Sequence, residues 1–311
     1  MHPKTLALGL AAASPAVAEI PLKCGNVNDV APPSLANKIR GLGARQSFPA
    51  LPPVNLTVHI VAMSDKREDG YLSEAEVDEQ VEIIKKIYKE QVGVTFNHTK
   101  AHNRWTINPA WGGSQIGENG KFFNPMKEAL HIGDYRTLNL YFRSIPEYTG
   151  FGGHCTNPQS EAIKGIDIKT RTLLDGCVVA DFTLNGSKHP YMNRGLTSVH
   201  EIGHWFGLFH PFQDDQKRHN NENPNPCLDV DPDDHVTDTP KMKPTEDMVG
   251  TCIIGSDTCP TANLTDVDPI HNYMAYSNDD CLSEFTPGQA SRIKEIWANY
   301  RVNATTSTFR D

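Results

Sequence analysis

The pattern of apolar and polar positions predicts the first elements of the chain. From Asn55 to Met63, apolar and polar residues alternate, which is typical of a strand with one buried face. From Ser73 to Gln91, apolar residues recur at helical spacing. This helix starts with a capping box, in which the side chains of Ser73 and Glu76 each bond a free backbone N–H. Its apolar positions are Val77, Val81, Ile84, Ile87 and Tyr88.

Short apolar runs further along the chain predict additional elements. The predicted strands are Val92–Asn97, Leu138–Phe142 and Cys177–Phe182. The predicted helices are Asn124–Ile132, Arg194–Phe206 and Gln289–Tyr300. The last helix follows Thr286-Pro287, a cap with proline at the first helical position. Elements in this order indicate an α+β fold, in which helices pack on a mixed sheet.

The first 52 residues lack such periodicity, and we expect them to precede the main domain. Residues 1–18 are typical of a signal peptide, because Lys4 precedes a short apolar run and Ala16-Val17-Ala18 suits cleavage before Glu19. The alternative is a core helix. Residues 19–52, rich in Pro, Ala, Gly and Asn, indicate a pro-segment or linker. Residues 53–311 then form one domain.

Composition and charge favour an exported protein. The 311 residues carry a formal net charge of -9 without a cluster of Lys and Arg, which argues against nucleic-acid binding. The sequence has no apolar run long enough to predict a membrane span. Its seven cysteines suit an oxidising compartment, so we expect secretion. Five N-x-S/T sequons are candidate glycosylation sites: Asn55, Asn97, Asn185, Asn263 and Asn303.

A histidine-rich part of the chain carries the residues of a metal site. His200 and His204 are four residues apart, so they project from one helix face and can bind one ion. Gly207 allows φ > 0, which would end the helix and bring His210 back as a third ligand. Three neutral imidazoles and one water make an open tetrahedral zinc site of the catalytic type. Glu201 lies where it can reach that water without binding the zinc.

This arrangement predicts an endopeptidase that hydrolyses peptide bonds of protein or peptide substrates. Zinc lowers the pKa of a bound water to near 7. Glu201 would act as the general base, taking the proton of that water and passing it to the leaving amine. Two alternatives remain open: an ordinary helix in which the histidines align by chance, and an inactive, zinc-stabilised secreted binding protein. The intact Glu201 and Gly207 favour the enzyme.

The same residues resemble a known family. His200 to His210 reads HExxHxxGxxH, the signature of the metzincin metallopeptidases, and Asn272-Tyr273-Met274-Ala275-Tyr276 resembles their Met-turn. The flanking segments resemble the pappalysin family, and within it the short, secreted fungal-type extracellular metalloproteases. These segments are Asp238-Thr239-Pro240, Asp257-Thr258-Cys259-Pro260, Asp268-Pro269-Ile270 and Phe285-Thr286-Pro287-Gly288-Gln289.

The resemblance implies a metzincin-like catalytic domain, divided by the active-site cleft. Its upper lobe would hold a twisted mixed sheet with helices, and its lower lobe would be irregular and disulfide-linked. Met274 matches the Met-turn, and Tyr276 matches a tyrosine that can stabilise the oxyanion. Ala275 departs from the usual Asp, which puts the stability of the turn in doubt. The zinc ligands and base carried over are His200, His204, His210 and Glu201.

Seven cysteines leave one without an intramolecular partner. Cys24, in Lys23-Cys24-Gly25 of the expected pro-segment, resembles the cysteine switch of related metzincins, in which a thiolate occupies the water position. The alternative is that Cys24 is paired and another cysteine is left over. Cys155 and Cys177 flank one loop and are expected to pair. For the last four, three connectivities are possible; the resemblance implies Cys227–Cys259 and Cys252–Cys281.

Two acidic features are further candidate sites. The resemblance places Asp279, in the loop after the Met-turn, at the floor of the pocket for the residue after the scissile bond, where it would pair with Arg or Lys. The alternative is a surface turn. A second acidic stretch could supply oxygen ligands to calcium, or could be a solvated loop: Asp229, Asp231, Asp233, Asp234 and Asp238.

Overall fold

The computed structural model describes residues 23–24, 49–113, 124–147, 150–158, 165–212, 227, 234–243, 249–260 and 267–302. The strands are β1 (Lys23–Cys24), β2 (Val54–Ala62), β3 (Phe96–Asn97), β4 (Asn103–Ile107), β5 (Leu138–Arg143), β6 (Phe151–Cys155) and β7 (Cys177–Ala180). The helices are α2 (Glu74–Ile87), α3 (Pro109–Gly112), α4 (Asn124–Leu130), α5 (Ile168–Leu173), α6 (Leu196–Trp205) and α8 (Pro287–Ile296). Helices α2 and α8 continue as π-helical turns, Tyr88–Val92 and Trp297–Val302.

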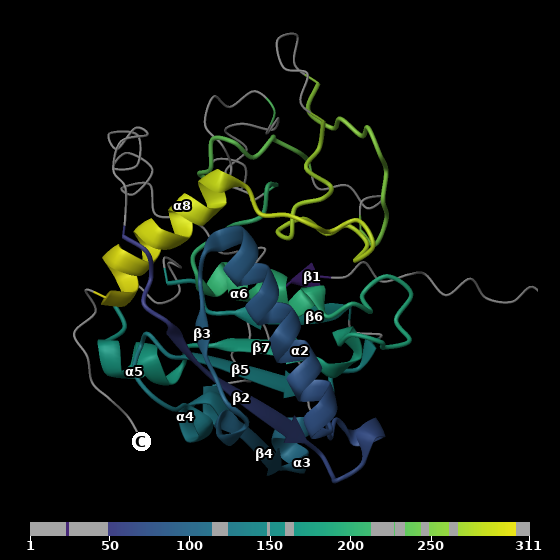
Figure 1. The fold of residues 1–311 in the computed structure, drawn as a ribbon. Helices are drawn as coiled ribbons and strands as arrows, with labels where there is room; N and C mark the ends of the chain where they lie inside the picture. The colour runs from purple at the N-terminus through teal and green to yellow at the C-terminus, as the bar shows by residue number, and fades with distance from the viewer. Residues whose placement is uncertain are drawn as a thin grey trace, which may run out of the picture.

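The strands form one mixed sheet of seven strands in the order β1-β6-β7-β5-β2-β3, with β4 also paired to β2 (Figure 1). All neighbouring strands are parallel except β6 and β7. Strand β6 lies between β7 and the two-residue β1, so only that short strand separates it from the edge of the sheet. The α+β class expected from the sequence is confirmed.

The two faces of the sheet are covered by different helices. On one face, Val58 and Ile60 of β2 belong to a large core with α2 and the metal-site helix α6. On the other face, Val61 and Tyr141 pack with Met126 of α4. In Figure 1, α2 crosses the sheet, and α6 lies between the sheet and the irregular segments. The sheet therefore supports α6 through buried apolar contacts.

Several predicted elements were correct in position, and one was wrong. The capping box at Ser73 and Glu76 is present, and α2 starts after it as expected. The strand predicted at Val92–Asn97 is reduced to Phe96–Asn97, because Gly93 turns the chain with φ +74° after the π-helical turn. Strands β4 and β6 were not predicted from the sequence.

The segments after α6 form an irregular lobe, which Figure 1 shows above the sheet together with α8. Two disulfides, Cys227–Cys259 and Cys252–Cys281, join its parts, and Cys155–Cys177 joins β6 to β7. These are the three pairs expected from the sequence and the resemblance. With few apolar residues in this lobe, each crosslink contributes roughly 2–4 kcal/mol to its stability.

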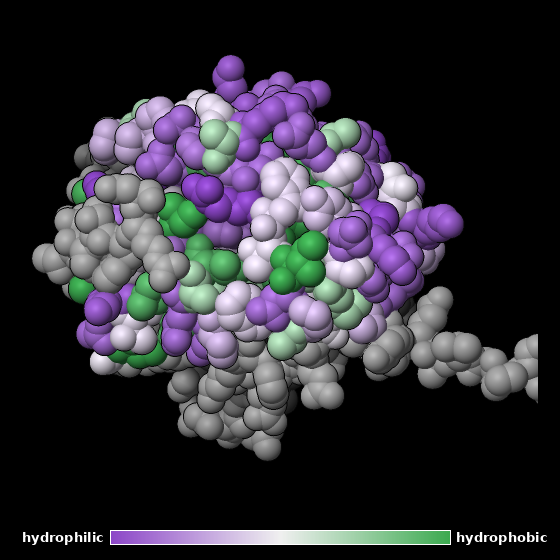
Figure 2. Space-filling view, turned by 90° about the horizontal axis from the view of Figure 1, so that it is seen from below, coloured by the Kyte–Doolittle hydropathy of each residue, from purple (hydrophilic) through white to green (hydrophobic). Residues whose placement is uncertain are grey.

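No helix of the described residues is long and apolar enough to cross a membrane. On the face seen in Figure 2, the hydrophobic residues form separate small patches among hydrophilic ones.

Candidate metal centre

Helix α6 and the turn after it bring three histidines together. His200 and His204 lie on one face of α6, and Gly207 follows with φ +90°. The Leu208 N–H donates to the Gly203 carbonyl (2.9 Å), which closes the turn. The turn therefore places His210 beside His200 and His204. Among the described residues, these three histidines form the one group of this kind that could hold a metal ion.

The three Nε2 atoms converge on one point. They lie 3.1 Å (His204–His200), 3.1 Å (His204–His210) and 3.2 Å (His200–His210) apart. The Nδ1 of His200 contacts the Tyr273 carbonyl oxygen at 2.8 Å, and the Nδ1 of His204 contacts the Leu208 carbonyl oxygen at 2.8 Å. Because a carbonyl only accepts, both Nδ1 atoms carry the proton, and both Nε2 atoms carry a lone pair.

Burial keeps the imidazoles of His200 and His204 neutral. Desolvation lowers the pKa of His200 to about 4. It also holds the pKa of His204 well below its usual value, and the neighbouring His210 and His200 lower it further. Neutral imidazoles are the form that binds metals, so the site is ready to accept a cation at neutral pH.

The residues predicted to form a Met-turn pack against helix α6. The Sδ of the fully buried Met274 lies against Gly203, so a side chain at that position of α6 would force Met274 to shift. The Asn272 side chain accepts from the Met274 N–H (2.9 Å) and fixes the turn. The Tyr276 ring centroid lies 4.9 Å from that of His210 and 5.7 Å from that of His200. The predicted Met-turn residues therefore meet the histidines.

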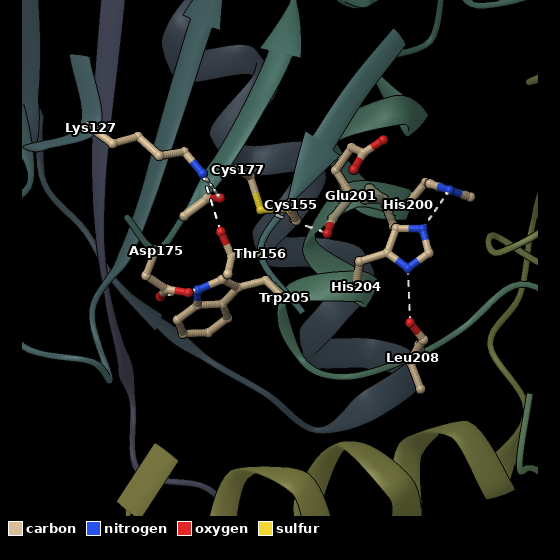
Figure 3. Close-up of a disulfide and its surroundings, with 12 residues drawn as sticks. Lys127, Cys155, Thr156, Asp175, Cys177, His200, Glu201, His204, Trp205 and Leu208 are labelled. Carbon is tan, nitrogen blue, oxygen red and sulfur yellow. Dashed lines mark hydrogen bonds between the residues drawn. A yellow bond between two sulfur atoms is a disulfide. The ribbon is translucent and has the colours of Figure 1, made fainter. Parts of the chain in front are cut away.

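Glu201 is 1% exposed and lies beside strand β6, next to the edge strand β1. The disulfide Cys155–Cys177 joins register partners of β6 and β7, and the Cys177 Sγ lies 3.7 Å from the Glu201 carbonyl oxygen (Figure 3). The disulfide thus lies next to the backbone of the candidate base.

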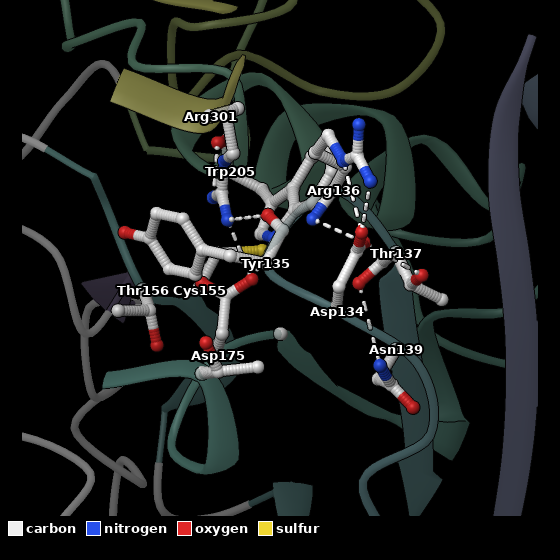
Figure 4. A network of polar contacts seen from close by, with 12 residues as sticks. Asp134, Tyr135, Arg136, Thr137, Asn139, Cys155, Thr156, Asp175, Trp205 and Arg301 are labelled. Atoms are coloured by element: carbon white, nitrogen blue, oxygen red, sulfur yellow. Dashed lines mark hydrogen bonds and ion pairs between the residues drawn. The ribbon is translucent and has the colours of Figure 1, made fainter. Parts of the chain in front are cut away.

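Two buried arginines, which the sequence analysis missed, hold the end of α6. The Arg301 guanidinium donates to the Trp205 carbonyl oxygen (2.8 Å) and to Asp175 Oδ2 (2.6 Å), and lies 3.9 Å from the centre of the Trp205 ring (Figure 4). Arg292 Nε donates to the Gly207 carbonyl oxygen (3.0 Å). The carboxy-terminal helix therefore fixes the turn that delivers His210.

A pocket opens beside His200. His200, Glu201 and Asp279 are among its lining residues. Asp279 is 2% exposed, and its carboxylate accepts from the Arg194 N–H (2.8 Å) at the start of α6. Burial raises the pKa of Asp279 to about 6. The apolar lining residues are Tyr191, Met192, Leu196, Val249 and Leu282.

The remaining predicted residues are placed as follows. Cys24 of β1 is the register partner of Gly153 in β6. The Asn97 side chain donates to Asn55 (2.9 Å), and Asn185 donates to Glu79 (2.7 Å). Residues 1–18, Asn263 and Asn303 lie outside the described residues.

The acidic stretch considered for calcium is only partly described. Asp238 accepts from the Thr286 hydroxyl and from the Gly288 N–H, both at 2.7 Å, and so caps α8. Asp234 is buried. Three further members lie outside the described residues: Asp229, Asp231 and Asp233.

Known proteins are similar to this chain in sequence and fold. The family model Peptidase_M43, described as pregnancy-associated plasma protein-A, matches residues 176–298. An extracellular metalloprotease of Pyricularia oryzae is 39% identical over 261 residues, covering 84% of this chain and 79% of the relative. An extracellular metalloprotease of Verticillium alfalfae is 34% identical over 311 residues, covering 97% of this chain and 99% of the relative.

Solved structures show the same fold at lower identity. The mature mirolysin of Tannerella forsythia, in complex with a cleaved peptide, has a TM-score of 0.56 at 18% identity and covers 82% of this chain and 97% of its own. A promirolysin mutant of the same organism has a TM-score of 0.59 at 18% identity, covering 86% and 87%.

Fold, histidine site and relatives together define a metalloendopeptidase of metzincin-like architecture, which acts on peptide or protein substrates. Within that class, the chain belongs to the pappalysin family, Peptidase_M43.

Proposed function

We propose that this protein is a secreted zinc-dependent endopeptidase whose metal is held by His200, His204 and His210. The observation that carries the proposal is the convergence of Nε2 lone pairs. Two neutral acceptors 3.1 Å apart repel each other unless a cation lies between them. Nitrogen ligands 2.0–2.1 Å from a tetrahedral zinc would be roughly 3.3 Å apart, which fits the observed spacing of 3.1–3.2 Å.

Glu201 and Tyr276 then each have a separate role in peptide hydrolysis. Zinc, when bound, supplies a Lewis acid that lowers the pKa of water at its open position. Glu201 accepts a proton from the attacking water and passes it to the leaving amine. Tyr276, whose ring stands beside His200 and His210, stabilises the negative charge on the former carbonyl oxygen.

Removing the metal tests this function against that of an inactive zinc-stabilised binding protein. Chelation should abolish cleavage of a peptide substrate, and one equivalent of zinc should restore it. Zinc binding without any cleavage, across a broad peptide library, would instead support the binding protein. If calcium also binds, its addition to the metal-free protein should raise the melting temperature. Secretion is tested separately, by showing that the exported protein starts after residue 18 of the precursor.

We further propose that Cys24 keeps a proenzyme latent as a cysteine switch. Its support is the pairing of Cys24 with Gly153, in the strand beside Glu201, while the other six cysteines form disulfides. Cys24→Ala should make the unprocessed chain active against peptides, whereas wild type should need removal of residues 19–52. Mass mapping that finds Cys24 in an intramolecular disulfide would refute the switch.

Asp279 is proposed to select Arg or Lys after the scissile bond. With its pKa near 6, the carboxylate is charged above that pH and neutral below it. The preference for basic residues in a peptide library should therefore strengthen as pH rises through 6. Asp279→Asn should weaken it at least tenfold, while Asp280→Ala, at an exposed side chain, should not. A wild-type preference for bulky apolar residues would disprove this role.

A further inference from the structure

Gly153 approaches the side chain of Glu201 too closely to carry a side chain of its own. A Cβ at Gly153 would lie 2.6 Å from Cγ of Glu201, and 2.9 Å from its Cδ and its Oε1. Carbon atoms pack at about 3.5–4.0 Å, so this overlap is severe. Because Cγ lies near the root of the Glu201 side chain, a change at the tip alone cannot relieve it.

The backbone conformation does not explain this glycine. A glycine inside a strand weakens the strand, and it marks a place where another group comes close. Gly153 does not belong to the glycines with positive φ. The group that comes close is Glu201, from a helix on the face of the sheet.

Strand β6 is held so that it cannot easily retreat from α6. Gly153 is the register partner of Val179 in β7. Two residues further on, the disulfide Cys155–Cys177 binds the two strands covalently, and the Cys177 Sγ touches the Glu201 carbonyl oxygen at 3.7 Å. A Cβ at position 153 would therefore displace the Glu201 side chain more readily than the strand.

We propose that Gly153 is a positioning residue, whose missing side chain creates the space in which the Glu201 carboxylate stands at the metal centre. Both residues line the same pocket as His200. The catalytic consequence rests on the proposed function of Glu201, whereas the packing of Gly153 against Glu201 does not.

A double-mutant cycle tests the packing independently of activity. The full chain is produced as wild type, Gly153→Ala, Glu201→Ala and the double variant, and their melting temperatures are compared. Gly153→Ala should lower the melting temperature by several degrees in wild type, because overpacking is destabilising. In the Glu201→Ala background, where Cγ, Cδ and Oε1 are gone, Gly153→Ala should lower the melting temperature by less than about one degree. Equal losses in both backgrounds would overturn the proposal.

Kinetics tests the catalytic consequence. In zinc-loaded Gly153→Ala, kcat should fall about a hundredfold, as expected for a misplaced catalytic group. KM should stay within about threefold, and zinc content should remain at one per chain. An unchanged kcat would overturn the positioning role. A wild type that cleaves no peptide would refute the proposed function, and the melting temperatures would still report on the packing.

A variant that fails to fold also gives an answer. If Gly153→Ala is not secreted, the double variant with Glu201→Ala should be, because the overlapping atoms are removed. Failure of both, with Glu201→Ala alone secreted, would show that position 153 is constrained by something other than Glu201.

Discussion

Glu201→Gln should reduce peptide hydrolysis by at least about a hundredfold while leaving zinc in place. Glutamine keeps the size of the buried side chain, which is 1% exposed, but it cannot accept the proton of the attacking water. General acid–base groups contribute about 10²–10⁴ to rate. The measurement is kcat/KM on a fluorogenic peptide together with zinc content by elemental analysis.

A matched control separates loss of the base from a general loss of charge. Glu82→Gln replaces a side chain on α2 that is 70% exposed and pairs with Lys85 at 2.6 Å. Such a surface pair contributes little, so activity and melting temperature should not change. More than a few per cent of wild-type turnover in Glu201→Gln, or a loss of its zinc, would contradict the assignment of Glu201 as base.

The metal site was predictable because its geometry is local. His200 and His204 share a helix face through their spacing alone, and Gly207 indicates the turn that brings His210 close to them. The capping box of α2 is local in the same sense. Each of these features depends on residues within one or two turns of each other.

The parts that were missed depend on residues far apart in the chain. Strand β6 contains two glycines and no regular alternation, and it forms because it pairs with β7 and is crosslinked to it through Cys155. Gly153 has a role only once that pairing places it against Glu201. A single sequence contains no signal for such a contact.

The buried arginines illustrate the same limit. Arg residues are almost never fully buried unless they are paired, so sequence alone places Arg301 on the surface of its helix. The structure buries it because Asp175 supplies the opposite charge and the end of α6 supplies the Trp205 carbonyl oxygen. The strand predicted over Val92–Asn97 is shorter in the structure for a local reason: the chain turns at Gly93, which overrides the apolar alternation of the segment.

His204→Ala should lose both the metal and the activity, in contrast to Glu201→Gln. His204 is fully buried, and its Nε2 lies within 3.1 Å of the other two histidine Nε2 atoms, so its removal leaves two ligands on opposite sides of the Gly207 turn. Losing only an outer partner of a ligand costs 10–100-fold in affinity, so losing a ligand should cost more than about a hundredfold.

The measurement is the zinc dissociation constant by competition with a chromogenic chelator, alongside peptide hydrolysis. His98→Ala is the matched control, because His98 is a half-buried histidine whose Nδ1 bonds the Leu56 carbonyl oxygen at 3.0 Å, and it does not belong to the group of converging histidines. It should keep both zinc and activity. If His204→Ala binds zinc as tightly as wild type, the ion is held elsewhere, and the three histidines do not form the metal site.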